Sequence, residues 1–108
     1  NISAPHTHAY ALERLHMRLQ TMEHSGGRKA LDVGSGSGYL TAALALLLGP
    51  EGRCFGVERS VRLVAVSKAN VDRDQGASFR APPASRVIFY NEDGWNGLDQ
   101  RAPFDVIH

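Results

Sequence analysis

The chain contains one cysteine, few aromatic residues and no excess of charge of either sign. Of its 108 residues, 7% are aromatic, and 12 basic residues stand against 11 acidic ones, which leaves a formal net charge of +1. The single cysteine, Cys54, cannot form an internal disulfide, so we expect a reducing compartment and a buried, unreactive thiol. The balanced charge, with no run of like charge, argues against nucleic acid or an anionic membrane surface as a partner.

Long hydrophobic runs and targeting signals are also missing. No segment approaches the roughly 20 apolar residues of a membrane-spanning helix, and the opening NISAP lacks the basic and apolar parts of a signal peptide. We therefore expect a cytoplasmic protein. The length and a hydrophobic share of 43% predict one globular domain over residues 1–108. The five histidines show no ligand spacing, so we expect no metal.

The most informative segment is residues 31–40, with the sequence LDVGSGSGYL. Apolar residues run into Asp32, and glycines then alternate with serines before a helical segment begins. Glycines at alternate positions let the backbone adopt positive φ and approach a ligand closely. The N-terminus of the following helix offers free N–H donors. We therefore expect a cofactor at this turn.

The glycine spacing discriminates between nucleoside cofactors. A dinucleotide fingerprint needs a glycine at the sixth position of the turn, where this chain has Tyr39. Three alternating glycines preceded by an aspartate suit a cofactor without pyrophosphate and with a cationic amino-acid end, which describes S-adenosylmethionine. Twenty residues past Gly38, Glu58 ends an apolar run, and its carboxylate can accept both hydroxyls of a ribose.

Helical and strand patterns alternate along the chain. The patterns predict helices at 9–23, 38–48 and 61–71, a loop at 75–85, and strands at 30–33, 54–57, 86–90 and 104–107. This alternation is typical of right-handed βαβ units, so we expect an α/β fold with a parallel sheet and helices on both faces. Ligands then bind beyond the carboxyl ends of the strands, where Gly34, Glu58 and Asp93 fall.

Four segments, in order, carry a resemblance to one enzyme family. They are ISAPHTHA from residue 2, ALDVGSGSGYLTA from residue 30, EDG from residue 92 and PFDVIH from residue 103. Over its whole length the chain resembles the protein-L-isoaspartate O-methyltransferases, and its ISAPH opening is the most specific part. The resemblance implies a Rossmann-like, S-adenosylmethionine-dependent methyltransferase that methylates the free carboxylate of L-isoaspartyl or D-aspartyl residues in damaged proteins and so initiates their repair. Its partners would be peptides and proteins that contain such residues, and we expect a monomer.

The resemblance also implies roles for individual residues. Ser3 would be catalytic, with its hydroxyl near the accepting carboxylate, although a serine there can also cap the first helix. His8 would lie beside the cofactor. Glu58 and Arg59 would face its ribose and adenine, and Asp93, with the glycine after it, would lie near adenine. The cofactor-binding set expected in this way is Ile2, Ser3, His8, Asp32, Gly34, Ser35, Gly36, Ser37, Glu58, Arg59, Asp93 and Gly94.

The chain departs from the family pattern at two positions and in length. Asn1 stands where the family usually has threonine, and Thr7 where it usually has methionine. These changes concern the peptide pocket and leave the inference on Ser3 intact. The family also has chain before residue 1 and about as much again beyond His108. The resemblance therefore implies a fragment that is truncated after the fourth strand, carries the cofactor half of the site and has weak or no activity alone.

Two other functions stay open at this point. One is a Rossmann-like methyltransferase with a different acceptor, although the chain lacks both a basic patch and the Asn/Asp-Pro-Pro-Tyr tetrad of base methylation. The other is a domain that binds the cofactor without catalysis. A dehydrogenase is the weakest alternative, because Tyr39 breaks the glycine spacing that NAD requires.

Overall fold

The computed structural model describes residues 13–14, 17, 28–49, 51–74 and 86–108. Glu13, Arg14 and Met17 are helical, as predicted for residues 9–23, whose other positions lie outside the described residues, as does the predicted loop at 75–85. The elements that follow are β1 (Lys29–Val33), α2 (Tyr39–Leu47), β2 (Arg53–Glu58), α3 (Val61–Asp74), β3 (Val87–Asn91), the 3-10 helices η1 (Gly94–Asn96) and η2 (Asp99–Arg101), and β4 (Val106–Ile107).

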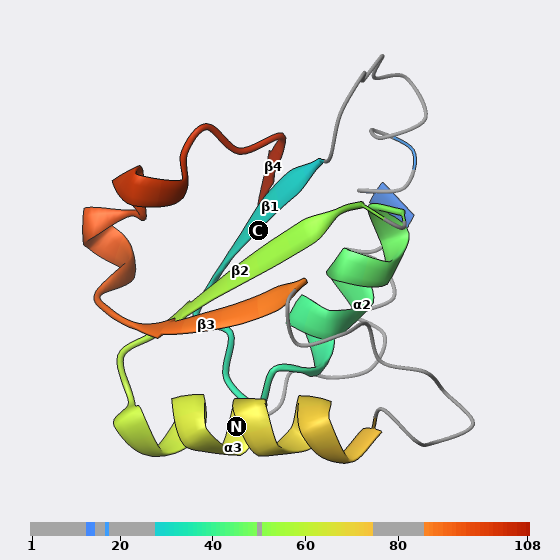
Figure 1. Ribbon diagram of the computed structural model, residues 1–108. Coiled ribbons are helices and arrows are strands. Elements are labelled where there is room, and N and C mark those ends of the chain that lie inside the picture. Colours follow the sequence, from blue (N-terminus) through green and yellow to red (C-terminus); the bar gives the residue numbers. More distant parts are fainter. Residues whose placement is uncertain (1–12, 15–16, 18–27, 50, 75–85) are drawn as a thin grey trace.

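The four strands form one parallel sheet in the order β3-β2-β1-β4 (Figure 1). Ala30 of β1 pairs with Cys54 of β2 and with Val106 of β4, and Cys54 pairs in turn with Val87 of β3. Since all strands run in one direction, their carboxyl ends meet at one edge of the sheet. The predicted α/β class, a Rossmann-like parallel sheet with flanking helices, is confirmed.

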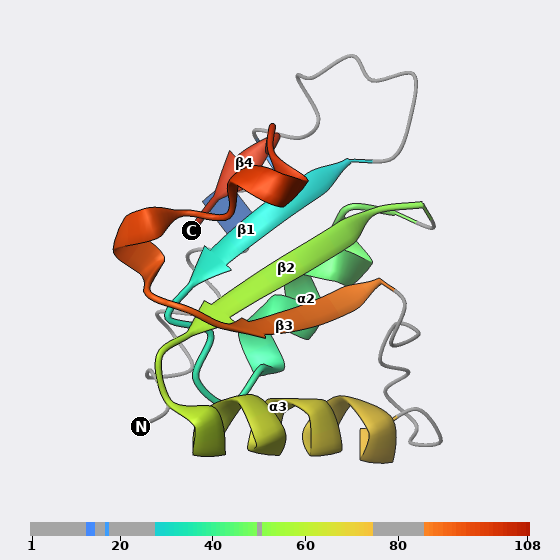
Figure 2. The ribbon, with the colours of Figure 1, turned by 60° about the vertical axis from the view of Figure 1, so that its left-hand side comes forward.

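Helices α2 and α3 lie on the same face of the sheet (Figures 1 and 2). Leu44 of α2 and Val64 of α3 belong to one buried cluster with Cys54 and Phe89 of the sheet. The chain crosses from β1 to β2 and then to β3 in the same direction, and right-handed crossovers in one direction place their helices on one face. This packing fixes the α3 helix beneath the turn that follows β1.

The connection from β3 to β4 covers the opposite face. Leu98 is buried there in a cluster with Leu31 and Phe55, and Phe104 meets the Phe55 ring edge-on at a centroid distance of 6.1 Å. The sequence predicted helices on both faces. Helices α2 and α3 occupy one face, and the other carries the short 3-10 helices η1 and η2, which were not predicted from the sequence.

The strand bounds differ from the predicted ones by one or two residues, and β4 is two residues long instead of four. Phe104 turns away to pack on Phe55, and Asp105 caps the start of β1. Its carboxylate accepts a hydrogen bond from the Lys29 backbone N–H at 2.8 Å, and its own N–H donates to the Lys29 carbonyl at 2.8 Å. The Asp105 side chain thus takes a backbone N–H of β1 that a longer β4 could have paired through its own backbone.

Cys54 is fully buried in the sheet, as predicted. Burial raises the pKa of its thiol well above the ordinary value, and the charge of Asp32 raises it further.

We expect iodoacetamide at pH 8 to leave Cys54 of the folded protein intact and to modify it in urea, as measured by mass spectrometry. Because the folded state disfavours the thiolate, stability should fall as the pH rises above about 8.5, the unfolded thiol's pKa. Rapid modification without urea would contradict this account.

Candidate functional site

The turn after β1 is built on three glycines in left-handed conformations. Gly34, Gly36 and Gly38 have φ of 75°, 56° and 88°, as the sequence predicted. The backbone N–H groups of Gly34 and Ser35 both donate to the carbonyl of Val57, at 2.8 and 3.2 Å, so the turn folds back over the end of β2. The turn is thereby held at the carboxyl edge of the sheet.

Helix α3 anchors this turn from below. The Ser67 hydroxyl donates to the Gly36 carbonyl at 2.7 Å, and the Asn70 side-chain amide donates to the Ser37 carbonyl at 2.9 Å. These bonds turn two carbonyl groups of the loop toward the helix and leave the loop with a fixed shape. Sequence reasoning missed both anchors, since a polar residue on a helix face gives no local sign of a partner more than 30 residues away.

Glu58 connects the end of β2 to the same turn. Its Oε1 accepts from the Gly36 backbone N–H at 3.2 Å, and its Oε2 accepts from the Ser60 N–H at 2.8 Å. An ionised carboxylate has about four acceptor positions, so two stay available for the hydroxyls of a ligand. The side chain is half-buried, which limits its freedom to turn away. Glu58 is thus a fixed acceptor beside the glycine turn.

A cavity of about 390 Å³ opens at the carboxyl ends of β1, β2 and β3, within the size range of small-molecule sites. It brings together five of the predicted site residues and four others. A Cβ placed on Gly34 would have no atom within 4 Å, so the backbone faces open space there. The lining residues are Val33, Gly34, Val57, Glu58, Arg59, Glu92, Asp93, Gly94 and Trp95.

Asp93 has a structural contact of its own. Its carboxylate accepts a hydrogen bond from the Trp95 backbone N–H at 3.0 Å and caps the 3-10 helix η1. The cap holds Trp95 at the cavity wall, and this residue is 94% exposed. An aromatic side chain left open beside a cavity offers a stacking surface for a planar group. Trp95 was not among the residues predicted for the site, although a lone tryptophan directly after an Asp-Gly pair was an available signal.

The other predicted loop residues do not line this cavity. Asp32 is buried, and its two carboxylate oxygens contact the Thr41 hydroxyl at 2.7 Å and His108 Nδ1 at 3.1 Å. Ser35 is also buried, and among the described residues its hydroxyl has no hydrogen-bond partner. The predicted residues Ile2, Ser3 and His8 lie outside the described residues.

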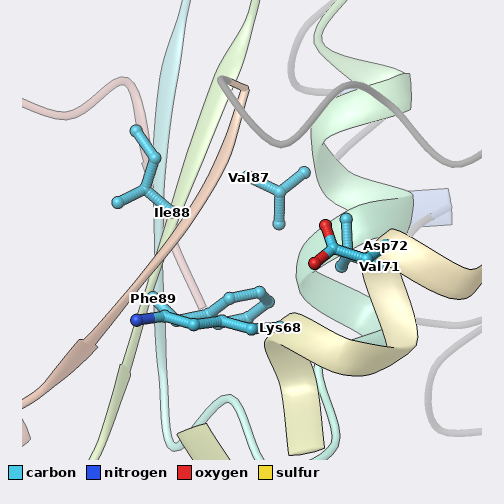
Figure 3. Close-up of a pocket in the computed structure, with 6 residues that line it drawn as sticks. All are labelled: Lys68, Val71, Asp72, Val87, Ile88 and Phe89. Atoms are coloured by element: carbon cyan, nitrogen blue, oxygen red, sulfur yellow. The ribbon is translucent and has the colours of Figure 1, made fainter. Parts of the chain in front are cut away.

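A second cavity, of about 250 Å³, lies between α3 and β3, away from the carboxyl edge. Figure 3 shows side chains from both elements facing it. Its walls are mainly apolar, with Lys68 and Asp72 as the charged members, and none of the predicted site residues belongs to it.

Two absences concern only the part of the chain that the structure describes. Within residues 13–14, 17, 28–49, 51–74 and 86–108, no three histidine, cysteine or acidic side chains come close enough together to hold a metal ion. Among these same residues, no helix has the length and apolar character needed to cross a bilayer.

The parallel sheet, the glycine turn and the cavity at the carboxyl edge define a Rossmann-like domain with a nucleotide-type site. A S-adenosylmethionine-dependent O-methyltransferase of Thermotoga maritima shares this fold, with a TM-score of 0.70 and 23% identity over 99% of this chain and 35% of that one. The chain belongs to the protein-L-isoaspartate(D-aspartate) O-methyltransferase family, whose sequence model matches residues 1–108.

Individual relatives agree with this membership. The protein-L-isoaspartate O-methyltransferase of Triticum aestivum is 47% identical over 99% of this chain and 44% of its own length. A Plasmodium falciparum protein described as a protein-L-isoaspartate O-methyltransferase was solved in complex with S-adenosyl-L-homocysteine. It superimposes with a TM-score of 0.74 and 32% identity, over 99% of this chain and 49% of that one. The chain therefore spans about half the length of the relatives that it matches.

Proposed function

We propose that the protein transfers a methyl group from S-adenosylmethionine to the free carboxylate of L-isoaspartyl or D-aspartyl residues in damaged proteins and so initiates their repair. Family membership supports this activity, and the observation that carries the cofactor is the position of Glu58. Its carboxylate is fixed beside the glycine turn with two acceptor positions available, which suits the paired hydroxyls of a ribose.

Different residues of the cavity would contact different parts of the cofactor. Glu58 would accept the ribose hydroxyls, and Arg59, Asp93 and Gly94 would line the adenine side. The open space over Gly34 lets the cofactor approach the backbone closely. We also propose that the remaining residues of the predicted set, which belong to the glycine turn and the N-terminal segment, contribute to cofactor binding. They are Ile2, Ser3, His8, Asp32, Ser35, Gly36 and Ser37.

Methylation of a carboxylate requires no proton transfer by the protein. A carboxylate is already ionised at neutral pH, so the site has to remove water from it and align one oxygen with the reacting carbon. When bound, S-adenosylmethionine supplies an electrophilic methyl group on a sulfonium. We assign the Ser3 hydroxyl to the alignment of the carboxylate, as the family resemblance implies. The partners would be isoaspartyl proteins, and we propose a monomer that acts in the cytoplasm without binding nucleic acid or membrane.

Two assays with matched ligands test the function. Calorimetric titration compares S-adenosylhomocysteine with NAD, and a radiolabelled methyl-transfer assay compares an isoaspartyl peptide with its normal aspartyl twin. Both use the 108-residue chain and the full-length gene product. We expect binding of S-adenosylhomocysteine alone and label on the isoaspartyl peptide alone. Label on a different acceptor would assign another methyltransferase, and binding without any transfer by the full-length protein would indicate a non-catalytic domain.

The Ser3→Ala variant is expected to lower methyl transfer to the isoaspartyl peptide at least about tenfold, because a hydrogen bond to a charged oxygen is lost. Initial rates at saturating cofactor measure the change. The Ser3→Thr variant retains a hydroxyl and serves as its matched control. Equal rates for wild type and Ser3→Ala would remove Ser3 from the catalytic role.

Trp95 provides a direct signal for occupation of the cavity. It is the sole tryptophan of the chain, and its exposed ring borders the cavity. Titration with S-adenosylhomocysteine is expected to shift the fluorescence emission to the blue, because the ligand displaces water from the indole. The shift should saturate at the Kd found by calorimetry. A Trp95→Phe variant should bind the ligand and lose the signal, whereas unchanged wild-type emission at saturation would place the ligand elsewhere.

A further inference from the structure

His108 directly follows β4 and lies beside the end of β1. Its backbone N–H donates to the Leu31 carbonyl at 2.9 Å, and its carbonyl accepts from the Val33 N–H at 2.9 Å. The residue is therefore fixed to the central strand on both sides of Asp32. Val33 and Gly34, the next residues of the chain, line the cavity at the carboxyl edge. Neither the predicted site nor the proposed function assigns His108 a role.

The imidazole of His108 is held by a buried acid. Its Nδ1 lies 3.1 Å from Asp32 Oδ1, while the Thr41 hydroxyl donates to Oδ2 at 2.7 Å. The Asp32 side chain is 3% exposed and that of His108 is 39% exposed. A buried carboxylate is costly unless it is paired, so Asp32 holds the ring through Nδ1. Among the described residues, Nε2 of His108 has no hydrogen-bond partner.

The order of the strands places His108, with its Nε2, in line with the predicted site residues at the carboxyl edge of the sheet. The ends of β3, β2, β1 and β4 follow one another along the edge, about 4.8 Å apart, and carry in turn Asp93, Glu58, the glycine turn and His108. With adenine assigned to the end of β3 and ribose to the end of β2, the glycine turn after β1 would hold the remainder of the cofactor. The end of β4, with His108, is then the next position along this edge.

We propose that His108 binds the acceptor carboxylate through Nε2 and that Asp32 positions its ring; this inference rests on the proposed function. In the doubly protonated ring, Nδ1–H donates to Asp32 and Nε2–H donates to one oxygen of the isoaspartyl carboxylate. The other oxygen forms the bond to the methyl carbon, the carbon–sulfur bond breaks, and its electron pair stays on sulfur. No proton moves. The product ester is neutral, so its bond to the imidazolium weakens and release is favoured.

Two substitutions separate this role from a structural one. The His108→Asn side chain can keep an N–H donor for Asp32 but has no equivalent of Nε2, whereas His108→Ala loses both. In the full-length gene product we expect both variants to lower kcat/KM for the isoaspartyl peptide about 10- to 100-fold. Calorimetry should show the Kd of S-adenosylhomocysteine unchanged within about twofold. Thermal unfolding should show His108→Asn as stable as wild type.

Asp32 is tested through its dependence on His108. Assayed at saturating S-adenosylmethionine, where a change in cofactor affinity does not alter the rate, an Asp32→Asn substitution should lower kcat/KM for the peptide in wild type and cause little further loss in the His108→Asn background, since both changes then act on the same contact. Wild-type kcat/KM for His108→Asn would overturn the proposal and leave a structural pair, as would a parallel loss of cofactor affinity. If the wild-type protein itself binds S-adenosylhomocysteine but does not methylate the isoaspartyl peptide, the proposed function fails first, and this inference fails with it.

Discussion

Replacement of Glu58 with glutamine is expected to weaken the binding of S-adenosylhomocysteine about 100-fold. The carboxylate accepts N–H groups from Gly36 and Ser60 and retains two acceptor positions for ribose hydroxyls. The amide has one acceptor oxygen in place of two, so it cannot serve the backbone and the ribose together. The loss of charge-assisted hydrogen bonds worth about 1.5–3 kcal/mol each gives this magnitude. Isothermal titration calorimetry measures it.

Glu51 provides the matched control for this substitution. It is exposed and lies just before β2, at the opposite end of the strand from Glu58. The Glu51→Gln variant makes the same change of charge and should retain wild-type affinity. If both variants bind like wild type, Glu58 has no part in ligand binding. If Glu58→Gln also lowers the melting temperature markedly, its two backbone bonds and not the ribose account for the loss.

The strands and the glycine turn could be predicted from the sequence because their determinants are local. Alternating apolar runs place the strands within one or two residues, and the residues at 34, 36 and 38 adopt positive φ because glycine does so without steric cost. The acid at the end of β2 follows from the same pattern. Adjacent parallel strands bring Gly34 and Glu58 to one edge, so part of the site was predictable as well.

The remaining features depend on contacts between distant parts of the chain. Asp32 was predicted to face the cofactor, but its contacts are with Thr41 and with His108, which lies 76 positions further along. No local pattern identifies such a partner. The position of Trp95 in the cavity wall depends on the 3-10 helix η1, which Asp93 caps. This cap could be recognised only after the structure had shown the 3-10 helix. The sequence therefore predicts the edge of the sheet at which the site lies. Which side chains line the cavity depends on tertiary packing.

Replacement of Gly38 with alanine is expected to destabilise the fold by about 3 kcal/mol. Gly38 precedes α2 with φ of 88°, which is unfavourable for any other residue by about 1–2 kcal/mol. A Cβ there would also lie 2.9 Å from Phe89 Cζ and 2.9 Å from Ser67 Cβ. Both neighbours are buried, and Ser67 is tied to the Gly36 carbonyl, so neither can move away without disturbing the turn. Overpacking of this kind adds about 1–3 kcal/mol.

Gly49 separates the two contributions. It has φ of 94°, yet a Cβ at this position would meet nothing within 4 Å, so Gly49→Ala carries the backbone cost alone, about 1 kcal/mol. Urea unfolding of both variants, followed by circular dichroism, measures the difference. Equal losses would show that the space under the turn can adapt. A larger loss of stability for Gly38→Ala would show that the glycine turn packs tightly on the core, because Gly38 belongs to the turn and also lies against Phe89 and Ser67.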